Sequence, residues 1–454
     1  MNPGHLTARR LAHAERNLPR YTSFPTALAF EPADGDAVTR AWLAQTGPDH
    51  AISVYAHVPF CSRLCWYCGC HTSVARDYER ISAFVARLKQ EAELWAEALG
   101  PHGGAAHLHF GGGSPNALKP GDFLELLRLL ARLFRLRDGA EVAVELDPAH
   151  LAPAFAAAAG EAGVTRASLG VQTLDPDVQA RINRIQPFEQ IAAAAESLRA
   201  AGVRSLNFDL MYGLPGQTPE NVAATAADAL SLRPDRVALF GYAHMPWMKK
   251  HQSMIRSEAL AGVAGRWAQA EAAAHVLGEH GYVPIGMDHY ARAEDPLAKA
   301  AAAGRLRRNF QGYTDDPAPV LVGLGPSAIG GFPQGHVQNA VRLDHWGEAV
   351  NARRLPTARR LAVTAEDRLR AAVIERLMCD LSVDIGDLCE SHGFPPGRLD
   401  PSLAAASRLQ ADGLCAVMGR TVTVPPDLAR LVRVVAACFD DRLTRMEGRH
   451  ARAV

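Results

Sequence analysis

Between about residues 50 and 245 the sequence alternates between short β-rich runs and amphipathic helical stretches, and this alternation constrains the fold more than any other feature. The β-rich runs are β-branched, aromatic or continuously apolar, as expected for strands that are buried on both faces. Six such runs end near Phe60, Gly112, Pro148, Thr173, Gly213 and Ala243. Six strand–helix units in series predict a parallel sheet with right-handed crossovers. A full eight-strand barrel and an open six-strand version both fit this spacing.

The rest of the chain predicts smaller parts around these units. The segment VLVGLGPSAIGG is typical of one more short strand followed by a Gly-rich turn. From about Thr364 the pattern is helical, and a hairpin-like GRTVTVPPD precedes the last helix, an order typical of a winged-helix-like domain. We expect an N-terminal arm (1–50), a barrel domain (51–300), a barrel-closing loop region (301–360) and a small, mainly helical C-terminal domain (361–454).

Composition excludes several classes of partner. The 454 residues include 48 basic and 48 acidic side chains, so the formal net charge is zero. Binding to nucleic acid or to an anionic membrane surface requires clustered excess Lys and Arg, which this balance does not favour. No run approaches the roughly 18–20 apolar residues of a membrane span, and the N-terminal sequence lacks the apolar run of a secretory signal. We expect a cytoplasmic enzyme.

The eight cysteines fall into two sets. Four are scattered among apolar neighbours in the C-terminal quarter and are best interpreted as small buried hydrophobes: Cys379, Cys389, Cys415 and Cys438. The other four lie within CSRLCWYCGC, directly after the first predicted strand. A disulfide framework is not expected in a long chain of this kind.

Within that run, Cys61, Cys65 and Cys68 have C-x3-C-x2-C spacing, so one tight loop can direct three thiolates at one centre. Three thiolates on an iron–sulfur cubane leave one iron open for a small chelating ligand. Zinc and unliganded thiols are the alternatives, but structural zinc usually joins two separated pairs and no second pair follows. The pattern therefore favours an iron–sulfur centre. Cys70 is too close to Cys68 to share the same cubane comfortably.

Two further motifs extend the argument. The GGGSP run at 111–115 follows the second predicted strand, and Glu145 stands at the end of the third, in VELDP. With the cysteine motif, these resemble the signature of the radical S-adenosylmethionine enzymes, whose three cysteines bind a [4Fe–4S] cluster. In that family the methionine end of S-adenosylmethionine chelates the open iron. All three motifs lie at the C-terminal ends of strands, where parallel barrels place their active sites.

The resemblance extends to a narrower family. YTSFPTA, HVPFCSRLCWYCGC, GVQT, FDLMYGLPGQT, GYAHMPWMKKHQ, GMDHYA and FQGYT together are similar to the oxygen-independent coproporphyrinogen III dehydrogenases of the coproporphyrinogen oxidase family. The resemblance implies an α/β fold with a partial (β/α)6 TIM-like barrel. It also implies a haem-biosynthetic enzyme that binds two S-adenosylmethionine molecules side by side and receives electrons from a donor such as flavodoxin or ferredoxin. A monomer is expected.

Carried over residue by residue, the resemblance assigns the cluster to Cys61, Cys65 and Cys68. It assigns the first cofactor molecule to Tyr55, Gly112, Glu145 and Ile329, and the second to Gly113, Ser114, Gln172, Arg184, Asp209 and Ala243. The implied reaction converts two propionates of coproporphyrinogen III to vinyl groups by a 5′-deoxyadenosyl radical, giving protoporphyrinogen IX and carbon dioxide. No side chain is assigned as a nucleophile, and Cys70 is at most an accessory group.

The substrate of such an enzyme is multiply anionic, so cations should line its pocket. The sequence offers these candidates: Arg305, Arg307, Arg308, Lys249 and Lys250. Three other functions remain as alternatives: a haem-binding chaperone on the same scaffold, a radical enzyme that opens and methylates haem, and a zinc-dependent regulator. Cys70 and the YTSFPTA segment argue against the chaperone, whose relatives tend to lack both.

Overall fold

A computed structural model describes residues 7–33 and 35–443, which form two compact units. We call residues 30–209 and 316–362 the cysteine unit, and residues 7–29, 210–315 and 363–443 the C-terminal unit. The division runs through strand β8 (Ser205–Tyr212), so that each unit contains part of this strand. Each unit is described separately below.

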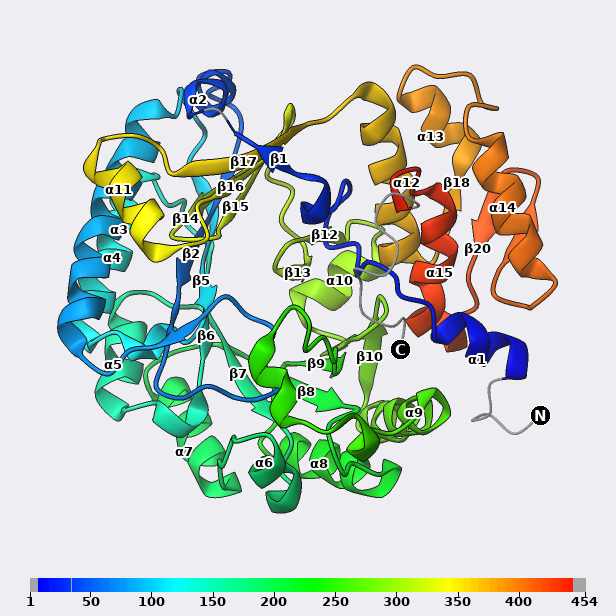
Figure 1. The fold of residues 1–454 in the computed structure, drawn as a ribbon, viewed down its shortest axis with the longest axis horizontal. Helices are drawn as coiled ribbons and strands as arrows, with labels where there is room; N and C mark the ends of the chain where they lie inside the picture. The colour runs from blue at the N-terminus through cyan, green and yellow to red at the C-terminus, as the bar shows by residue number, and fades with distance from the viewer. Residues whose placement is uncertain (1–6, 34, 444–454) are drawn as a thin grey trace. The chain divides into compact units, whose positions relative to one another are not determined.

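The cysteine unit is built on one sheet, shown in Figure 1. Its strands, in their order across the sheet, are β1 (Glu31–Pro32), β17 (Thr357–Ala362), β16 (Gly335–Asn339), β15 (Ile329–Phe332), β14 (Val320–Leu324), β2 (Ile52–Val58), β5 (Ala105–Gly112), β6 (Glu141–Leu146), β7 (Arg166–Gln172) and the start of β8. From β14 to β7 neighbouring strands pair in parallel, and from β14 to β1 they pair antiparallel. The extra strand predicted in VLVGLGPSAIGG is β14, which pairs with β2.

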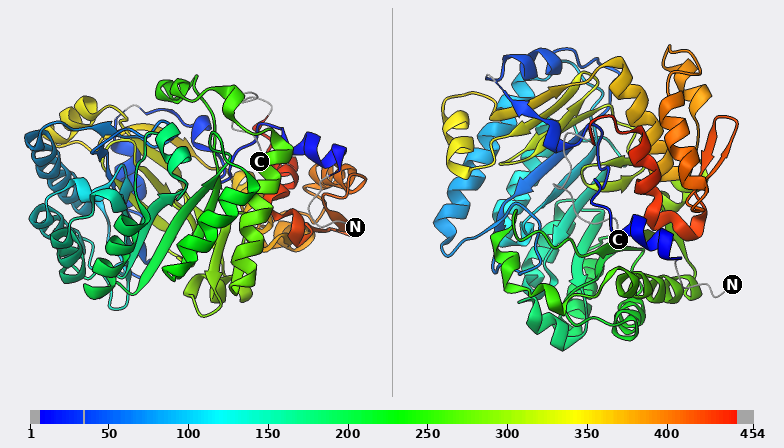
Figure 2. Two further views of the ribbon diagram at one scale, coloured as in Figure 1. Left: turned by 90° about the horizontal axis from the view of Figure 1, so that it is seen from below. Right: turned by 45° about the vertical axis from the view of Figure 1, so that its right-hand side comes forward.

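Helices cover one face of the parallel strands, as Figures 1 and 2 show for α3, α4 and α5. The helices of this unit are α2 (Ala37–Leu43), α3 (Tyr78–Ala98), α4 (Pro120–Leu133), α5 (Pro153–Glu161), α6 (Pro176–Arg181), α7 (Phe188–Ala200) and α11 (Leu343–Asn351). In α4 the buried residues Phe123, Leu126, Leu127 and Leu130 recur every three or four positions, so one stripe of the helix faces the core. Six of the seven residues of β2 are buried, as predicted for a strand covered on both faces.

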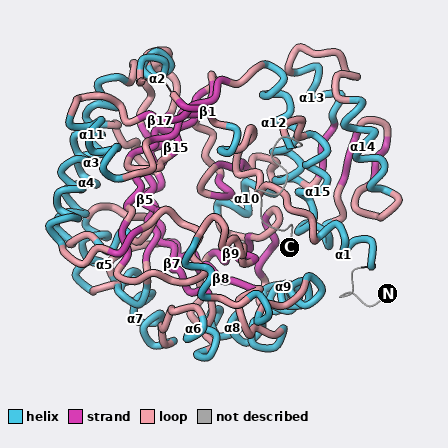
Figure 3. The backbone as a smooth tube through the Cα atoms, in the orientation of Figure 1, coloured by secondary structure: helices cyan, strands magenta, loops and turns pink. Residues whose placement is uncertain are grey.

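The C-terminal unit continues the strand–helix series and adds a helical part. Its elements are α1 (Ala8–Ala14), α8 (Pro219–Ser231), β9 (Arg236–Gly241), α9 (Val263–Glu279), β10 (Tyr282–Ile285), β11 (His289–Arg292), α10 (Pro296–Ala302), β12 (Arg307–Asn309), β13 (Gly312–Thr314), α12 (Ala365–Asp380), β18 (Ser382–Asp384), α13 (Ile385–Ser391), α14 (Asp400–Gln410), β19 (Ala416–Met418), β20 (Thr421–Thr423) and α15 (Val432–Ala436). Helices α12 to α14 precede the β19–β20 hairpin, and α15 follows it; the winged-helix-like domain stays a prediction. Figure 3 distinguishes these helices from the short strands.

The predicted fold class is confirmed. β2, β5, β6, β7, β8 and β9 are the six strands of the partial (β/α)6 TIM-like barrel, and a small helical part follows toward the C-terminus. The four-part domain division stays a prediction. Across residues 7–33 and 35–443, none of the helices combines the length and apolar character needed to cross a membrane.

Candidate active site

The cysteine motif lies in a loop that leaves the C-terminal end of β2. The loop is bounded by a short parallel pair, β3 (Phe60–Cys61) and β4 (Ser73–Val74). Cys61 Sγ lies 3.1 Å from Thr72 Oγ1, and the Cys68 amide donates to the carbonyl oxygen of Cys65 at 3.1 Å. These contacts fold the loop tightly enough for its thiols to face one cavity.

This cavity has a volume of about 170 Å³ and lies within the cysteine unit. Ten of the residues predicted to bind the cluster or the cofactor line it: Cys61, Cys65, Cys68, Gly112, Gly113, Ser114, Glu145, Gln172, Arg184 and Asp209. Cys70 lines it as well, and its amide donates to Cys68 Sγ at 3.4 Å. The structure thus brings together the loop after β2, residues from β5 to β8 and the segment between α6 and α7.

Three predicted residues do not line this cavity. Tyr55 lies in β2, and its hydroxyl is 3.1 Å from His57 Nδ1. Ile329 is the first residue of β15. Ala243 follows β9 and belongs to the C-terminal unit. Their predicted contacts with S-adenosylmethionine stay predictions.

Arg184 is a buried cation beside the cysteine loop. Its Nη2 atom lies 3.2 Å from Asp147 Oδ1 and donates to the Gly170 carbonyl oxygen at 2.7 Å, while Nη1 is 3.4 Å from Cys65 Sγ. Burial alone would raise the pKa of Asp147, but the hydrogen bond from His150 and the charge of Arg184 lower it to about 2. The ion pair therefore holds a fixed positive charge next to the thiols.

The cysteine loop is also tied to the segment that carries Arg184. The Trp66 amide donates to the Ile182 carbonyl oxygen at 3.0 Å. Asn183 Nδ2 donates to the carbonyl oxygen of Leu64 at 2.9 Å. These hydrogen bonds give partners to the Trp66 amide and to the Leu64 carbonyl oxygen in the cysteine loop. The segment between α6 and α7 therefore fixes the position of the loop.

The Gly-rich loop after β5 has no room for larger side chains. A Cβ atom on Gly112, whose φ is +113°, would lie 2.6 Å from the ring of His57. A Cβ atom on Gly113 would lie 2.5 Å from the Phe60 carbonyl oxygen, next to the first cysteine. The Gly112 amide donates to Glu145 Oε2 at 3.1 Å. The glycines therefore let the backbone itself form one wall of the cavity.

Two carboxylates line the cavity from strands on either side of β7: Glu145 on β6 and Asp209 on β8. Burial alone would raise the pKa of Glu145, but a 3.0 Å hydrogen bond with His109 and the charge of that ring lower it. Asp209 accepts hydrogen bonds from Ser168 Oγ at 3.0 Å and from Asn207 Nδ2 at 2.8 Å. Ionised carboxylates are strong acceptors for hydroxyl groups, such as those of a ribose.

The residues present fit an iron–sulfur cluster and a nucleoside-like cofactor. Three cysteine thiols on one loop supply the ligands that such clusters use. Burial raises the pKa of the Cys61 thiol to about 11, so its thiolate form needs the positive charge that bound iron would supply. Among the described residues, no three His, Cys, Asp or Glu side chains are arranged to hold a single metal ion.

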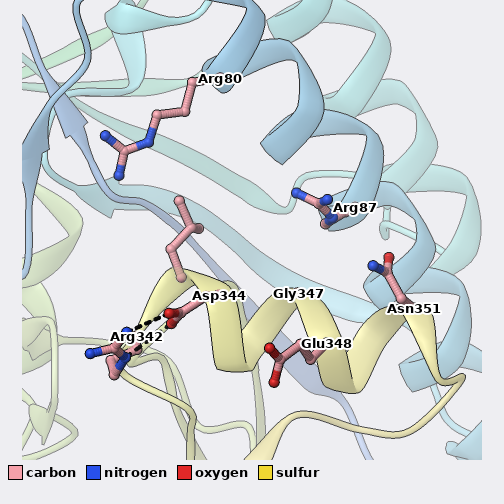
Figure 4. Close-up of a pocket in the computed structure, with 8 residues that line it drawn as sticks. Arg80, Arg87, Arg342, Asp344, Gly347, Glu348 and Asn351 are labelled. Carbon is pink, nitrogen blue, oxygen red and sulfur yellow. Dashed lines mark hydrogen bonds and ion pairs between the residues drawn. The ribbon is translucent and has the colours of Figure 1, made fainter.

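A second cavity, of about 600 Å³, opens between α3 and α11 (Figure 4). Arg80 and Arg87 project from α3 toward it, and Asp344 and Glu348 come from α11. Arg342 forms an ion pair with Asp344 at the rim of this cavity. The lining carries charges of both signs and no cysteine. It therefore does not match the chemistry that the sequence predicts.

Sequence reasoning missed some functional candidates. Asp147 pairs with Arg184, and its only signal was its place in a Leu-Asp-Pro turn at a strand end. Asn207 donates a hydrogen bond to Asp209. This contact could have been predicted from the sequence, since residues two apart in a strand share one face. Ser168, which also supports Asp209, carried no signal that distinguishes it from any other strand serine.

Most of the strand–helix series and the cysteine loop lie within residues 55–229, and this segment matches the Radical SAM superfamily. This match defines the class of protein. The chain is 46% identical to the oxygen-independent coproporphyrinogen III oxidase of Bradyrhizobium diazoefficiens, covering 98% of this chain and 99% of the relative. It is 44% identical to the enzyme of the same name from Paracoccus denitrificans, with 95% of each chain covered. The solved structure of Escherichia coli coproporphyrinogen III oxidase, a radical S-adenosylmethionine enzyme, matches with a TM-score of 0.89 and 32% identity, covering 94% of this chain and 99% of that one.

The chain therefore belongs to the oxygen-independent coproporphyrinogen III oxidase family and is a radical S-adenosylmethionine enzyme. The resemblance drawn from the sequence motifs is confirmed. Membership of the superfamily implies a [4Fe–4S] cluster and S-adenosylmethionine as cofactors.

Proposed function

We propose that this chain catalyses the oxygen-independent oxidative decarboxylation of two propionates of coproporphyrinogen III, giving protoporphyrinogen IX in haem biosynthesis. One observation supports this proposal most strongly. Three cysteines, a glycine wall and two carboxylates line one cavity, in a chain that shares 46% identity with a named family member over nearly its full length.

In this proposal Cys61, Cys65 and Cys68 hold the cluster. When bound at these residues, the cluster and S-adenosylmethionine would supply the radical chemistry that removes hydrogen from the propionate side chain. The chain itself orients the reactants and excludes water. The tethers between the cysteine loop and the α6–α7 segment hold the thiols in place, and the glycine wall allows close approach of the cofactor.

We also propose that two S-adenosylmethionine molecules bind. The first meets Tyr55, Gly112, Glu145 and Ile329, and the second meets Gly113, Ser114, Gln172, Arg184, Asp209 and Ala243. The presence of two separate carboxylates at the cavity, Glu145 and Asp209, supports this stoichiometry, because each can bind the hydroxyl groups of one ribose.

Further parts of the proposal concern partners and location. A reducing donor such as flavodoxin or ferredoxin supplies electrons to a monomeric enzyme. A cytoplasmic location suits cysteines that must stay reduced to bind iron. The zero net charge supports the absence of nucleic-acid or membrane partners.

The test is an anaerobic assay with reconstituted cluster, S-adenosylmethionine, a reductant and coproporphyrinogen III. Deoxyadenosine, carbon dioxide and protoporphyrinogen IX should form together. Alanine at position 61, 65 or 68 should abolish all three products and reduce the iron content. Cys438→Ala is the matched control, because Cys438 is a half-buried cysteine of the C-terminal unit and should leave the iron content unchanged.

The other outcomes identify the alternatives. Deoxyadenosine without a vinyl product would assign the radical chemistry to another substrate. A methylated product without carbon dioxide would indicate the haem-opening enzyme. Tight haem binding with neither product would indicate the chaperone.

A further inference from the structure

A ring of contacts in the C-terminal unit joins two arginines through three aromatic side chains. The Arg20 guanidinium lies 5.7 Å from the ring centroid of Phe240, and Phe240 and His289 meet edge to face at 5.6 Å. His289 meets Tyr313 edge to face at 5.2 Å, and the Arg308 guanidinium lies 4.3 Å from the Tyr313 centroid. Arg308 Nη2 closes the ring by donating to the Arg20 carbonyl oxygen at 3.3 Å. We call these five residues the arginine–aromatic ring.

The two guanidiniums of this ring are bound to carbonyl oxygens rather than to carboxylates. Arg20 Nη2 donates to the Gly241 carbonyl oxygen at 2.8 Å, at the C-terminal end of β9. Nε and Nη1 of Arg308 are buried without a hydrogen-bond partner. Within residues 7–33 and 35–443, neither side chain forms an ion pair with a carboxylate. Buried donors that lack an acceptor are costly, so this arrangement favours a ligand that brings one.

The surroundings carry excess positive charge. Asp288 is the neighbouring acid, and its Oδ1 lies 2.7 Å from His289 Nδ1. Burial alone would raise the pKa of Asp288, but the His289 hydrogen bond and the charges of His289, Arg308 and Arg20 lower it to about 2. Burial and the positive charge of Arg20 also lower the pKa of Arg433 to about 9. One ionised carboxylate thus faces several cations, and an added anion would be stabilised.

We propose that Arg20 and Arg308 bind a propionate carboxylate of the tetrapyrrole. This inference rests on the proposed function. Arginine suits the role because its planar donors pair with both oxygens of a carboxylate. The ring lies at the end of a barrel strand, where ligands of this fold bind.

The structure also distinguishes among the three arginines that the sequence predicts to line the substrate pocket. Arg305 is exposed, and Arg307 forms an ion pair with Glu375 at 3.0 Å. Arg308 alone of the three belongs to the arginine–aromatic ring. Arg20 comes from the N-terminal segment, far from Arg308 in sequence, and no sequence pattern connected the two.

The experiment measures binding of coproporphyrin III, the stable oxidised form, to the reconstituted holoenzyme by fluorescence. Its tetramethyl ester, which lacks the carboxylate charges, is the second probe. Arg20→Gln and Arg308→Gln should each weaken binding of the acid by roughly 10- to 100-fold, as expected for one charge-assisted pair. Binding of the ester should be the same in wild type and variants. Arg308→Lys should recover part of the affinity.

Arg256→Gln, an exposed arginine of the same unit, is the matched control and should bind both probes as the wild type does. Iron content and S-adenosylmethionine affinity verify that each variant is folded, and if one glutamine variant fails this check, the other decides. Equal affinity for the acid in wild type and both variants would overturn the inference, as would equal loss for acid and ester. If the wild type forms no protoporphyrinogen IX while both glutamine variants bind coproporphyrin III more weakly than the wild type does, the proposed function fails and the carboxylate site stands.

Discussion

Glu91 of α3 provides the sharpest test of how burial and hydrogen bonding compete in this structure. Its carboxyl group is fully buried, and it accepts four N–H hydrogen bonds. Trp346 Nε1 lies at 3.0 Å, the Gly325 amide at 2.7 Å and Asn339 Nδ2 at 2.8 Å, while Trp95 Nε1 lies at 3.3 Å. The carboxyl thereby ties α3 to the turn that precedes β15.

Four donors favour the ionised carboxylate, but burial favours the neutral acid, and burial raises the pKa of Glu91 to about 8. As the pH rises, a carboxyl group whose pKa is raised by folding loses its proton at a lower pH in the unfolded chain than in the folded protein. Stability is therefore highest below the unfolded value of 4.5 and decreases as the pH rises toward 8, by about 1.4 kcal/mol per pH unit. The full cost over this interval is on the order of 5 kcal/mol.

The substitution Glu91→Gln removes this titration and keeps the shape of the side chain. The assay is thermal unfolding of wild type and variant from pH 5 to pH 8. Over these three pH units the loss is about 4 kcal/mol. The midpoint of the wild type, relative to that of the variant, should therefore decrease by on the order of 4 °C, because an unfolding entropy of about 2.1 cal/mol/K per residue gives a 454-residue chain roughly 1 °C per kcal/mol. Glu93→Gln, at an exposed position of the same helix, should show no such trend.

A midpoint difference that stays constant with pH would refute the reasoning. It would mean that Glu91 is ionised in the folded protein throughout, so that its four donors outweigh the cost of burying the charge. The magnitude of the difference at pH 5 is a separate quantity. It reports only how well an amide replaces a neutral acid among these donors.

Two further predictions concern the cavity. Gly113→Ala should lower the iron content after reconstitution several-fold, because its Cβ atom would press on the Phe60 carbonyl oxygen at 2.5 Å. Gly121→Ala, which has open space around its Cβ position, should keep the wild-type iron content, and equal iron in both variants would contradict the steric argument. Asp209→Asn should reduce the S-adenosylmethionine stoichiometry measured by calorimetry from two to one, since an amide replaces the charged acceptor; unchanged stoichiometry would remove Asp209 from the second binding site.

Much of the barrel could be predicted because its information is local. A strand such as β2 is apolar throughout, and a helix such as α4 repeats its apolar residues every three or four positions. The C-x3-C-x2-C spacing within one loop likewise needs no long-range contact to be recognised. The other seven predicted residues that line the cavity came from the family resemblance, and the structure places them together with the cysteines without testing what each one binds.

The remaining features depend on contacts between distant segments. Arg184 would be a solvated helix residue if only its neighbours in RINRIQ were considered, but in the structure it is buried against Asp147, 37 residues earlier. Glu91 on an amphipathic helix resembles any surface glutamate until its partners from residues 325 to 346 are known. In both cases the sequence pattern describes one side of an interaction whose other side is set by the fold.

A buried charge that pairs within its own unit, as Arg184 does with Asp147, costs little further and can serve as a fixed part of the site. Arg308 differs, because two of its buried nitrogen atoms have no partner in the described chain. Binding of a ligand carboxylate would supply acceptors for these donors and recover the lost hydrogen bonds. The difference between these two arginines therefore separates a group that holds the site together from one that we propose binds a substrate carboxylate.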